Sequence, residues 1–576
     1  MPAHKNENDL MDMPPHAATR CVAAVVLCGA LLLPTLPAAR GADCPIVLQD
    51  VTQESGIQFR HSDGSRGEYH IVEYVSAGLA LFDYDGDGWI DVYFLNGAPF
   101  GAEPDTPLPQ DALYRNLGGW RFADVTQQAG LGDTQHGLGV TAADYNNDGY
   151  QDLYVNNCGP NVLYQNQGDG TFLDITARAG VENGQRVGAC VCFLDADRDG
   201  LLDLFVSNYV KFSLDKHRHT TLRGISVYPS PLAYEPDTNT FYRNNGDGAF
   251  ADATDSSGIG AHAGTGMGGV CGDYDGDGDT DIFVCNDMTP NFLFENDGSG
   301  VFTEVALFQG TAFDVTGRAQ GSMGVDCGDY DNDGWLDFVQ TCFQDEMPVL
   351  YRNSGHGYFD DVSRLTGVGA AAHRRVTWGV GLVDFDNDGY RDIFIATGHL
   401  EDNVALKDDT IQYETQNILL RNTGDGRFVD VSSRSGPGML LKRCSRGAGF
   451  DDLDNDGDID VVILNSRREP TILRNDSPRN HHWLQVRLIG TQASRDGVGA
   501  RVKVTAGDLI QIDEVHSGRG YQGHSGMRLH FGLGRHDQID RIDVDWIGGQ
   551  SEAFYDVKVD QLVTLIEGTG QYPESR

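Results

Sequence analysis

Basic residues and long apolar runs are what this sequence has least of. It contains 42 lysines and arginines against 85 aspartates and glutamates, which gives a formal net charge of -43. A chain this acidic repels phosphate backbones, so we expect no nucleic-acid partner. Beyond residue 39, no segment is long and apolar enough to cross a bilayer, so we expect no transmembrane span in the mature chain.

The single long apolar run lies near the N-terminus, from Cys21 to about Ala39. Pro34 and Pro37 interrupt this run, and its length is short for a membrane span. These features favour a cleaved export signal over a transmembrane anchor. We expect residues 1–42 to be a signal peptide, and the mature protein to be secreted, periplasmic or attached to the cell surface.

Common catalytic and zinc-binding motifs are also missing. The chain has no G-x-S-x-G elbow, no H-E-x-x-H, no phosphate loop and no C-x-x-C pair. No acid, base or nucleophile can therefore be assigned to catalysis. Eleven cysteines leave nine after removal of Cys21 and Cys28, and an odd number implies at least one unpaired thiol.

What the chain does contain is a repeated acidic loop, D-x-[DN]-x-D-G-x-x-D. It occurs seven times, with first residues 51 to 78 apart, and such a period indicates a repeat architecture. The residues at positions one, three, five and nine are Asp83, Asp85, Asp87 and Asp91; Asp144, Asn146, Asp148 and Asp152; Asp195, Asp197, Asp199 and Asp203; Asp273, Asp275, Asp277 and Asp281; Asp329, Asp331, Asp333 and Asp337; Asp384, Asp386, Asp388 and Asp392; and Asp452, Asp454, Asp456 and Asp460.

The spacing in these Asp loops predicts calcium ligands. Residues one, three and five of a tight loop turn their oxygens inward, residue seven offers a backbone carbonyl, and glycine at six permits the turn. Position nine closes the coordination sphere, and hard oxygen ligands suit Ca²⁺. The simpler alternative is that each Asp-Gly pair only forms a hairpin turn. A turn needs no further carboxylates that repel one another, so seven copies in register favour about seven Ca²⁺ ions.

Two further patterns complete each repeat. Each Asp loop is followed by an L-Y-R-N motif, as at Leu113–Asn116, and then by an F-x-D-V-T motif, as at Phe122–Thr126. With the small-residue segment before each loop, the unit reads as four short strands, which is typical of a propeller blade. The seventh unit stops at Asn475, and an orphan copy of its last strand, Leu48–Thr52, precedes the first unit. We therefore expect an all-β, seven-bladed propeller over residues 45–477, closed by its N-terminal strand.

The C-terminal residues 480–570 alternate polar and apolar residues, as in Leu484–Leu488 and Arg501–Val504, which predicts a small β-sandwich. Several motifs here resemble the ASPIC/UnbV domain: His482–Leu484, Gly497–Ala500, Gly520–Tyr521, Leu529–Gly534 and Val544–Trp546. The Asp-loop repeats resemble FG-GAP/VCBS propeller repeats. The whole chain is similar to the cartilage acidic protein family, and this resemblance implies calcium binding and an extracellular setting without supplying a reaction.

The expected strand directions place a ligand site at the end of the propeller away from the Asp loops. Long insertions at Tyr209–Asn239 and His399–Gln416 emerge there, and scarce basic residues recur nearby. Arginine suits carboxylate, sulfate or phosphate groups, although these side chains could also balance local acids. The candidate ligand residues are Arg186, Arg318, Arg374, Arg375, Trp378, His399 and Arg446.

Two functions fit these features. The first is an extracellular binding or adhesion module for a glycan or protein, and the alternative is a calcium-dependent polysaccharide lyase or glycoside hydrolase. The missing catalytic motifs favour binding. The same strand directions place Cys158 and Cys190 at one end of neighbouring blades, which predicts a disulfide between them.

Overall fold

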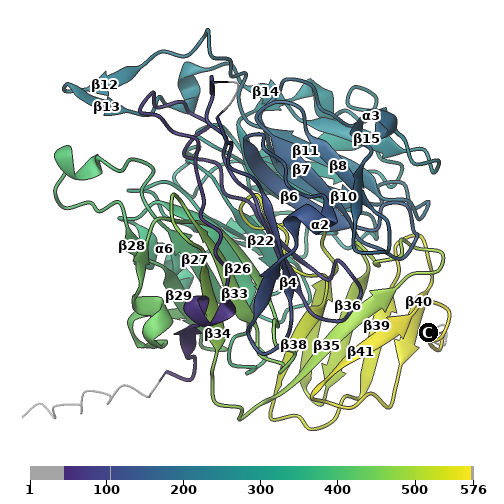
Figure 1. Cartoon of the computed structure of the whole chain (residues 1–576). Helices are drawn as coiled ribbons and strands as arrows, with labels where there is room; N and C mark the ends of the chain where they lie inside the picture. Colours follow the sequence, from purple (N-terminus) through teal and green to yellow (C-terminus); the bar gives the residue numbers. More distant parts are fainter. Residues whose placement is uncertain (1–43, 104–105, 573–576) are drawn as a thin grey trace, which may run out of the picture. The chain divides into compact units, whose positions relative to one another are not determined.

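The computed structural model describes residues 44–103 and 106–572, and the expected signal peptide at residues 1–42 lies outside them. The described chain is all-β apart from short helical turns (Figure 1). No helix in these residues has the length and apolar character needed to cross a membrane.

Up to Asn475, the described chain forms seven four-stranded antiparallel sheets, each built from one repeat. In order, the strands are β2 (Leu79–Phe82), β3 (Asp91–Phe94), β4 (Ala112–Asn116) and β5 (Phe122–Asp124); β6 (Gly137–Ala143), β7 (Asp152–Asn157), β8 (Val162–Asn166) and β9 (Phe172–Asp174); β10 (Gly188–Leu194), β11 (Asp203–Asn208), β15 (Thr240–Asn244) and β16 (Phe250–Asp252); β18 (Gly266–Gly272), β19 (Asp281–Asn286), β20 (Phe292–Asn296) and β21 (Phe302–Glu304); β22 (Val325–Gly328), β23 (Asp337–Gln340), β24 (Val349–Asn353) and β25 (Phe359–Asp361); β26 (Thr377–Val383), β27 (Asp392–Thr397), β29 (Ile418–Asn422) and β30 (Phe428–Asp430); and β32 (Ser445–Asp451), β33 (Asp460–Asn465), β34 (Thr471–Asn475) and β1 (Leu48–Asp50).

The strand from the start of the chain lies in the seventh sheet. β1 pairs antiparallel with β34, with Leu48 opposite Asn475 and Asp50 opposite Leu473. This pairing joins the two ends of the repeat region, which are more than 400 residues apart in sequence. The seventh sheet thereby has the same four strands as the other six.

The first strand of each sheet is buried, and several, such as β6, β18 and β32, are rich in small residues. These strands contact one another in sequence order, and β32 of the seventh sheet contacts β2 of the first. Small side chains are needed because the backbones approach closely. A Cβ on Gly139 would lie 1.8 Å from the carbonyl oxygen of Ala189 in the next sheet.

The asparagine that ends each L-Y-R-N motif links neighbouring sheets. Its Nδ2 donates a hydrogen bond to a backbone carbonyl in the Asp loop of the preceding sheet, at the second residue of that loop. The bond satisfies a buried backbone group. Asn116 of the first sheet reaches Leu453 of the seventh in the same way, at 2.8 Å. The other six pairs are Asn166–Tyr84, Asn244–Tyr145, Asn296–Ala196, Asn353–Tyr274, Asn422–Tyr330 and Asn475–Phe385.

Short helical turns follow most of the F-x-D-V-T strands. Asp124 accepts the backbone N–H of Thr126 at the start of one such turn, and Gly130 ends it with a φ of 77° that favours glycine. The helices are α1 (Thr52–Ser55), α2 (Thr126–Ala129), α3 (Thr176–Ala179), α4 (Ala306–Gln309), α5 (Ser363–Thr366) and α6 (Val368–Ala372), with 3₁₀ turns η1 (Pro231–Ala233), η2 (Ile259–Ala261), η3 (Val404–Leu406), η4 (Ser432–Arg434) and η5 (Pro437–Leu440). Three two-stranded ribbons join the loops: β12 (Thr220–Leu222) with β13 (Ile225–Val227), β14 (Asp237–Thr238) with β17 (Ala263–Gly264), and β28 (Thr415–Gln416) with β31 (Lys442–Arg443).

The C-terminal residues form two further sheets, drawn in yellow-green to yellow in Figure 1. One contains β38 (Leu529–Gly534), β35 (His482–Ile489) and β41 (Gln561–Ile566), and the other contains β37 (Leu509–Glu514), β36 (Arg501–Ala506), β39 (Arg541–Asp545) and β40 (Ser551–Phe554). Apolar side chains of both sheets, such as Val486 and Val544, share one buried core, which also includes Phe193 of the third repeat sheet.

The C-terminal residues contact the Asp-loop end of the repeat sheets. Arg528 donates to the carbonyl of Gly88 at 2.7 Å, and the N–H of Asp144 donates to Asp496 at 2.8 Å. The Asp452 carboxylate likewise accepts a hydrogen bond from Gln485. These contacts involve the first, second and seventh loops, so this end of the sheets is covered by the chain itself.

One C-terminal segment, Ser517–His524, runs among the first strands of the repeat sheets. Gly520 exchanges two backbone hydrogen bonds with Val325 of β22, and His524 exchanges backbone bonds with Leu79 and Leu81 at β2. Tyr521 is completely buried and packs against Trp378. The segment therefore ties the first and fifth sheets together from the inside.

Candidate calcium loops and ligand cavities

Each Asp loop connects the first and second strands of its sheet and is organised by its first aspartate. In the fifth sheet, the Asp329 carboxylate accepts the backbone N–H groups of Asp333 at 3.1 Å and Gly334 at 2.8 Å. Gly334 has a φ of 91°, a left-handed value that favours glycine at the turn. These bonds curl the loop so that its carboxylates face a common centre.

The aspartate at position nine fixes the other side of the loop. Asp337 accepts the N–H of Asn353 at 2.8 Å and that of Tyr330 at 3.2 Å. The same two contacts recur at Asp91, from Asn116 and Tyr84. The L-Y-R-N strand therefore positions the ninth residue as well as pairing in the sheet, a role that the sequence patterns do not reveal.

The structure brings the predicted calcium ligands of individual loops together. Carboxylate oxygens lie within 4.8 Å of one another in groups that include Asp83, Asp85 and Asp91; Asp195, Asp197 and Asp199; Asp273, Asp275 and Asp281; Asp329, Asp331 and Asp333; and Asp384, Asp386 and Asp392. In the second loop, Asp144 accepts the N–H groups of Asp148 and Gly149, so the loop closes in the same manner.

Several of these oxygens lack a hydrogen-bond partner. At position three of three loops, the Oδ1 atoms of Asp331, Asp386 and Asp454 are buried and accept no hydrogen bond from the described residues. Unpaired buried carboxylate oxygens are costly unless a cation neutralises them. The donor set, spacing and unpaired atoms of these residues fit a hard divalent cation such as Ca²⁺.

Burial also raises the pKa values of the loop carboxyls. Loss of hydration raises the pKa of Asp195 and of Asp329 to about 7, and that of Asp452 to about 6. Neighbouring loop aspartates raise these pKa values further. Without a cation, these carboxyl groups therefore retain protons at a much higher pH than free aspartate does.

Arginines of the L-Y-R-N motif neutralise part of this charge, a role that sequence reasoning missed. Arg352 contacts Asp331 and Asp333 at 2.6 Å each, which are positions three and five of its loop. Equivalent pairs join Arg115 to Asp85 and Asp87, Arg421 to Asp386 and Asp388, and Arg243 to Asp197. The second and fourth repeats have Gln165 and Glu295 at this position.

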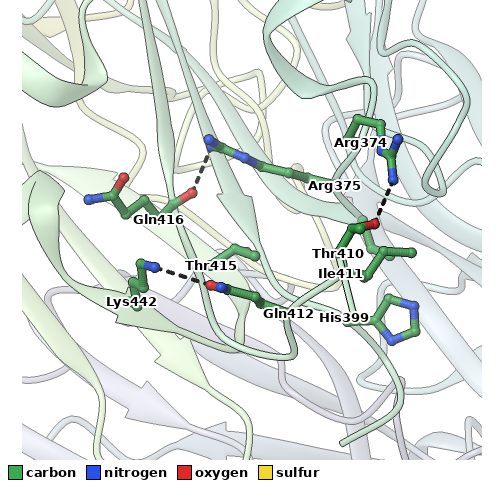
Figure 2. Close-up of a pocket in the computed structure, with 10 residues that line it drawn as sticks. Arg374, Arg375, His399, Thr410, Ile411, Gln412, Thr415, Gln416 and Lys442 are labelled. Carbon is green, nitrogen blue, oxygen red and sulfur yellow. Dashed lines mark hydrogen bonds between the residues drawn. The ribbon is translucent and has the colours of Figure 1, made fainter. Parts of the chain in front are cut away.

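Three of the predicted ligand residues lie together at the other end of the strands. Arg374, Arg375 and His399 line a cavity of about 240 Å³ with Lys442, which we call the basic cavity. Figure 2 shows these side chains, with Arg374 bonded to Thr410 at 3.1 Å, Arg375 to the carbonyl of Gln416 and Lys442 to Gln412. The Arg374 side chain is 63% exposed, so it is accessible to a ligand from solvent.

Two other predicted ligand residues are buried instead. Arg446 is 1% exposed, lies 4.0 Å over the Trp378 ring and donates to the carbonyl of Tyr74. Trp378 is fully buried and donates to the carbonyl of Gly398. Both side chains lie in first strands of the repeat sheets and pack inside the protein. An external ligand cannot reach them, although their chemistry would suit one.

The remaining two arginines do not line the basic cavity. Arg186 donates to Thr238 and Thr240 and supports a strand end. Arg318 is exposed in the loop before β22, where Asp314 accepts its backbone N–H.

A second, larger cavity adjoins the basic cavity and shares His399 and Ile411 with it. Its volume is about 500 Å³, and Tyr74, Tyr228 and Phe343 form part of its wall. Asp287 and Glu346 also line it, so we call it the acidic cavity. Neither acid belongs to a repeated motif, so the sequence offered no signal for this site.

The predicted disulfide between Cys158 and Cys190 is wrong. All nine cysteines from Cys44 onward carry free thiols. The backbone of Cys158 pairs with Val187 at a strand end, while the Cys190 thiol is buried deeper in β10, 4.0 Å from the Cys192 sulfur. Cys190 therefore belongs to a buried apolar cluster, and small thiols suit these crowded first strands.

Family comparison supports both parts of the architecture. The FG-GAP-like repeat family matches residues 83–155, 146–206, 232–284 and 273–340, and the ASPIC and UnbV family matches residues 490–572. Cartilage acidic protein 1 of Homo sapiens is 26% identical over 81% of this chain and 68% of its own length. The Xenopus tropicalis protein of the same name is 23% identical over 82% of this chain, which spans only 61% of that relative.

Solved structures give a looser match. A lectin of Agrocybe aegerita that recognises non-reducing terminal N-acetylglucosamine shares 17% identity, with a TM-score of 0.36 over 63% of this chain and 83% of the lectin. An exotype rhamnogalacturonan lyase shares 12% identity, with a TM-score of 0.30 over 86% of this chain and 90% of the lyase.

Proposed function

We propose that this chain, an FG-GAP-repeat protein with a C-terminal ASPIC and UnbV domain, is a secreted, calcium-binding, seven-bladed β-propeller that binds an extracellular ligand. The ligand is a glycan or protein that presents an anionic group to the basic cavity. The propeller comprises residues 45–477, and residues 480–570 form the C-terminal domain. Export rests on the apolar run from Cys21 to about Ala39.

Closure into a seven-bladed ring is supported by contacts between the first and seventh sheets. β32 contacts β2, Asn116 donates to Leu453, and β1 supplies the last strand of the seventh sheet. In an open array, the first and last sheets would each lack a neighbour on one side. In a closed ring, every sheet packs between two others. Calcium binding is supported by the unpaired oxygens of Asp331 and Asp386.

The observation that carries the ligand proposal is the basic cavity at the end of the sheets opposite the Asp loops. The Asp-loop end contacts the C-terminal residues, whereas Arg374 precedes β26 and Lys442 lies in the short strand β31, both at the opposite end of the repeat sheets. Three cationic side chains line this cavity in a chain of net charge -43. Such a concentration attracts carboxylate, sulfate or phosphate groups despite the overall charge.

Binding of purified protein to a panel of acidic polysaccharides tests this proposal. We expect binding that weakens with added salt, and at least tenfold loss of affinity in the Arg374→Ala/Lys442→Ala variant. Arg318→Ala is the matched control, because Arg318 is exposed but lies outside the cavity. Unchanged affinity in the double variant, or binding to none of the polysaccharides and to no extracellular protein, contradicts the proposal. New unsaturated sugar ends would instead indicate the lyase alternative.

A further inference from the structure

The acidic cavity contains two carboxylates that do not belong to any Asp loop. Asp287 follows β19 and Glu346 follows β23, so both lie at the strand ends opposite the loops. A Cβ on Gly321 would lie 3.2 Å from Asp287 Oδ1 and 3.7 Å from Glu346 Oε2. Because Gly321 has no side chain, one oxygen of each carboxylate borders the same small space, next to the Phe343 Cβ.

Both carboxylates are held in place by neutral donors. Tyr209 donates its hydroxyl to Asp287 Oδ2 at 2.7 Å, and Glu346 Oε2 accepts the backbone N–H groups of Gly321 at 2.9 Å and Phe343 at 3.2 Å. These donors leave Asp287 Oδ1 and Glu346 Oε1 without a hydrogen bond from the described residues. Asp287 is only 6% exposed, so little water is available to hydrate its carboxylate.

Neither acid has a cationic partner among the residues that the structure describes. Two other acids lining the cavity do: Glu401 pairs with Lys407, and Asp345 lies 4.0 Å from Arg374. Buried like charges without a counter-charge are unfavourable. Asp287 and Glu346 therefore leave a negative charge that an external group can neutralise.

The remaining wall suits the hydrocarbon part of a ligand. Tyr74, Tyr228, Phe343 and Met323 line the cavity, and aromatic faces attract organic cations. A hydrated metal ion gains nothing from these apolar side chains, whereas an alkyl chain that ends in an ammonium group contacts both kinds of surface.

His399 supplies a separate indication of a ligand. It is 4% exposed and forms part of the wall of both cavities. In the shorter of its contacts with Glu401, Nδ1 accepts the backbone N–H at 3.0 Å, which places the ring proton on Nε2. No described residue accepts that proton, so the His399 ring, which lines both cavities, carries an unpartnered donor.

We propose that the acidic cavity binds the ammonium group of a lysine side chain from a partner protein, while His399 donates to a carbonyl or carboxylate of the same segment. This inference deepens the proposed function, because it selects a protein ligand over a glycan. The segment would place a lysine between Asp287 and Glu346 and an acidic residue at Arg374 and Lys442.

Burial supports this choice through its effect on the two acids. Loss of hydration raises the pKa of Glu346 to about 7, with a smaller contribution from Asp287, whose own pKa is raised to about 6. A bound ammonium group stabilises the ionised carboxylates, so it should lower both pKa values and offset the free energy lost when they are buried.

The test uses Nα-acetyl-lysine N-methylamide as the probe and calorimetry on the calcium-loaded full chain. We expect the lysine probe to bind and its norleucine analogue, which lacks the ammonium group, to bind at least tenfold more weakly. The isosteric Asp287→Asn/Glu346→Gln variant should lose at least tenfold in affinity for the lysine probe. Asp409→Asn is the matched control, because Asp409 is exposed and does not line the cavity.

Gly321→Ala provides a second variant that changes no charge. Its methyl group would enter the space between the two carboxylates, so we expect weaker lysine binding with unchanged calcium-dependent melting. Equal affinity for the lysine and norleucine probes, or full binding by the double variant, overturns the inference. Arg374→Ala/Lys442→Ala should still bind the lysine probe, so a failure of the basic-cavity proposal is distinguishable from a failure here.

Discussion

The two ends of the repeat sheets both concentrate carboxylates, but they do so by different means. At the Asp-loop end, acids recur at fixed spacing and are held by backbone N–H groups, as Asp329 is by Asp333 and Gly334. At the opposite end, Asp287 and Glu346 come from unrelated loops, and one carboxylate oxygen of each lies close to Gly321. The first arrangement is repeated with each sheet, whereas the second occurs where two particular loops meet.

Under the proposed function, the Asp-loop end governs stability and the cavity end governs ligand binding. An Asp loop is part of every repeat sheet, and loops contact the C-terminal residues through the Asp144 N–H and the Asp452 carboxylate, so a cation bound there would stabilise both parts of the chain. The cavities are formed by loops that vary from one sheet to the next, and such loops usually determine what a repeat protein binds. Changes at the Asp-loop end should therefore alter unfolding, and changes at the cavity end should alter binding alone.

The largest expected effect is that of calcium removal on unfolding. A site at 100-fold excess of free ligand over Kd contributes about 2.7 kcal/mol, and several sites add to one another. We expect chelation to lower the melting temperature by more than 10 °C in differential scanning calorimetry, since each kilocalorie shifts a large domain by about 2–4 °C. Added Ca²⁺ should restore it.

The control for this measurement is chelation of the Arg374→Ala/Lys442→Ala variant, which should show the same fall in melting temperature as the parent. An unchanged melting temperature in metal-free protein would contradict calcium binding by the Asp loops. A fall in melting temperature that differs between the variant and the parent would mean that the two ends of the sheets do not act independently.

The repeated features were the ones that could be predicted from the sequence. Asp, Gly and Asn at fixed spacing predicted the loops and strands, and the orphan copy at Leu48–Thr52 predicted the pairing of β1 with the seventh sheet that the structure contains. These features depend on local spacing, so one chain reveals them. Strand direction also predicted which end of the sheets holds Arg374, Arg375 and His399, which line one cavity, but their role in binding stays a prediction.

Features that depend on long-range packing were not predictable in the same way. Burial of Arg446 against Trp378 and the free thiols of Cys158 and Cys190 depend on side chains from distant repeats. The same holds for Ser517–His524, which the alternating pattern of the C-terminal residues does not place among the first strands. Asp287 and Glu346 were indistinguishable from the many other acids until the fold brought them together.

A smaller effect is expected from pH. In metal-free protein, burial raises the pKa of Asp144, Asp195 and Asp329 to about 7, above the unfolded value near 3.8. The stability associated with these groups is therefore present at low pH and is lost as pH rises from about 4 to 7. Calcium requires the ionised carboxylates, so it reverses this trend.

We therefore expect metal-free protein to melt at a higher temperature at pH 5 than at pH 8, and calcium-loaded protein to do the opposite. Melting curves at constant ionic strength, with chelator or Ca²⁺ at each pH, provide the measurement. Parallel pH profiles for the two forms would show that the loop carboxyls do not govern unfolding.

The smallest expected effect comes from changing one residue beside a single Asp loop, at the position that is arginine in most L-Y-R-N motifs. Arg352 pairs with Asp331 and Asp333 in the fifth sheet, whereas the fourth has Glu295, which accepts a hydrogen bond from Tyr274 at 2.7 Å. Glu295→Arg should place a guanidinium beside Asp275 and Asp277. Exposed ion pairs are worth about 0–1 kcal/mol, so we expect the metal-free melting temperature to rise by only a few degrees. Calcium affinity at this loop should fall, because arginine competes for the same oxygens.

Tyr274→Phe removes the tyrosine bond alone and serves as the control. A Glu295→Arg variant that binds calcium more tightly than the parent would mean that arginine organises the loops for the metal rather than replacing part of its charge.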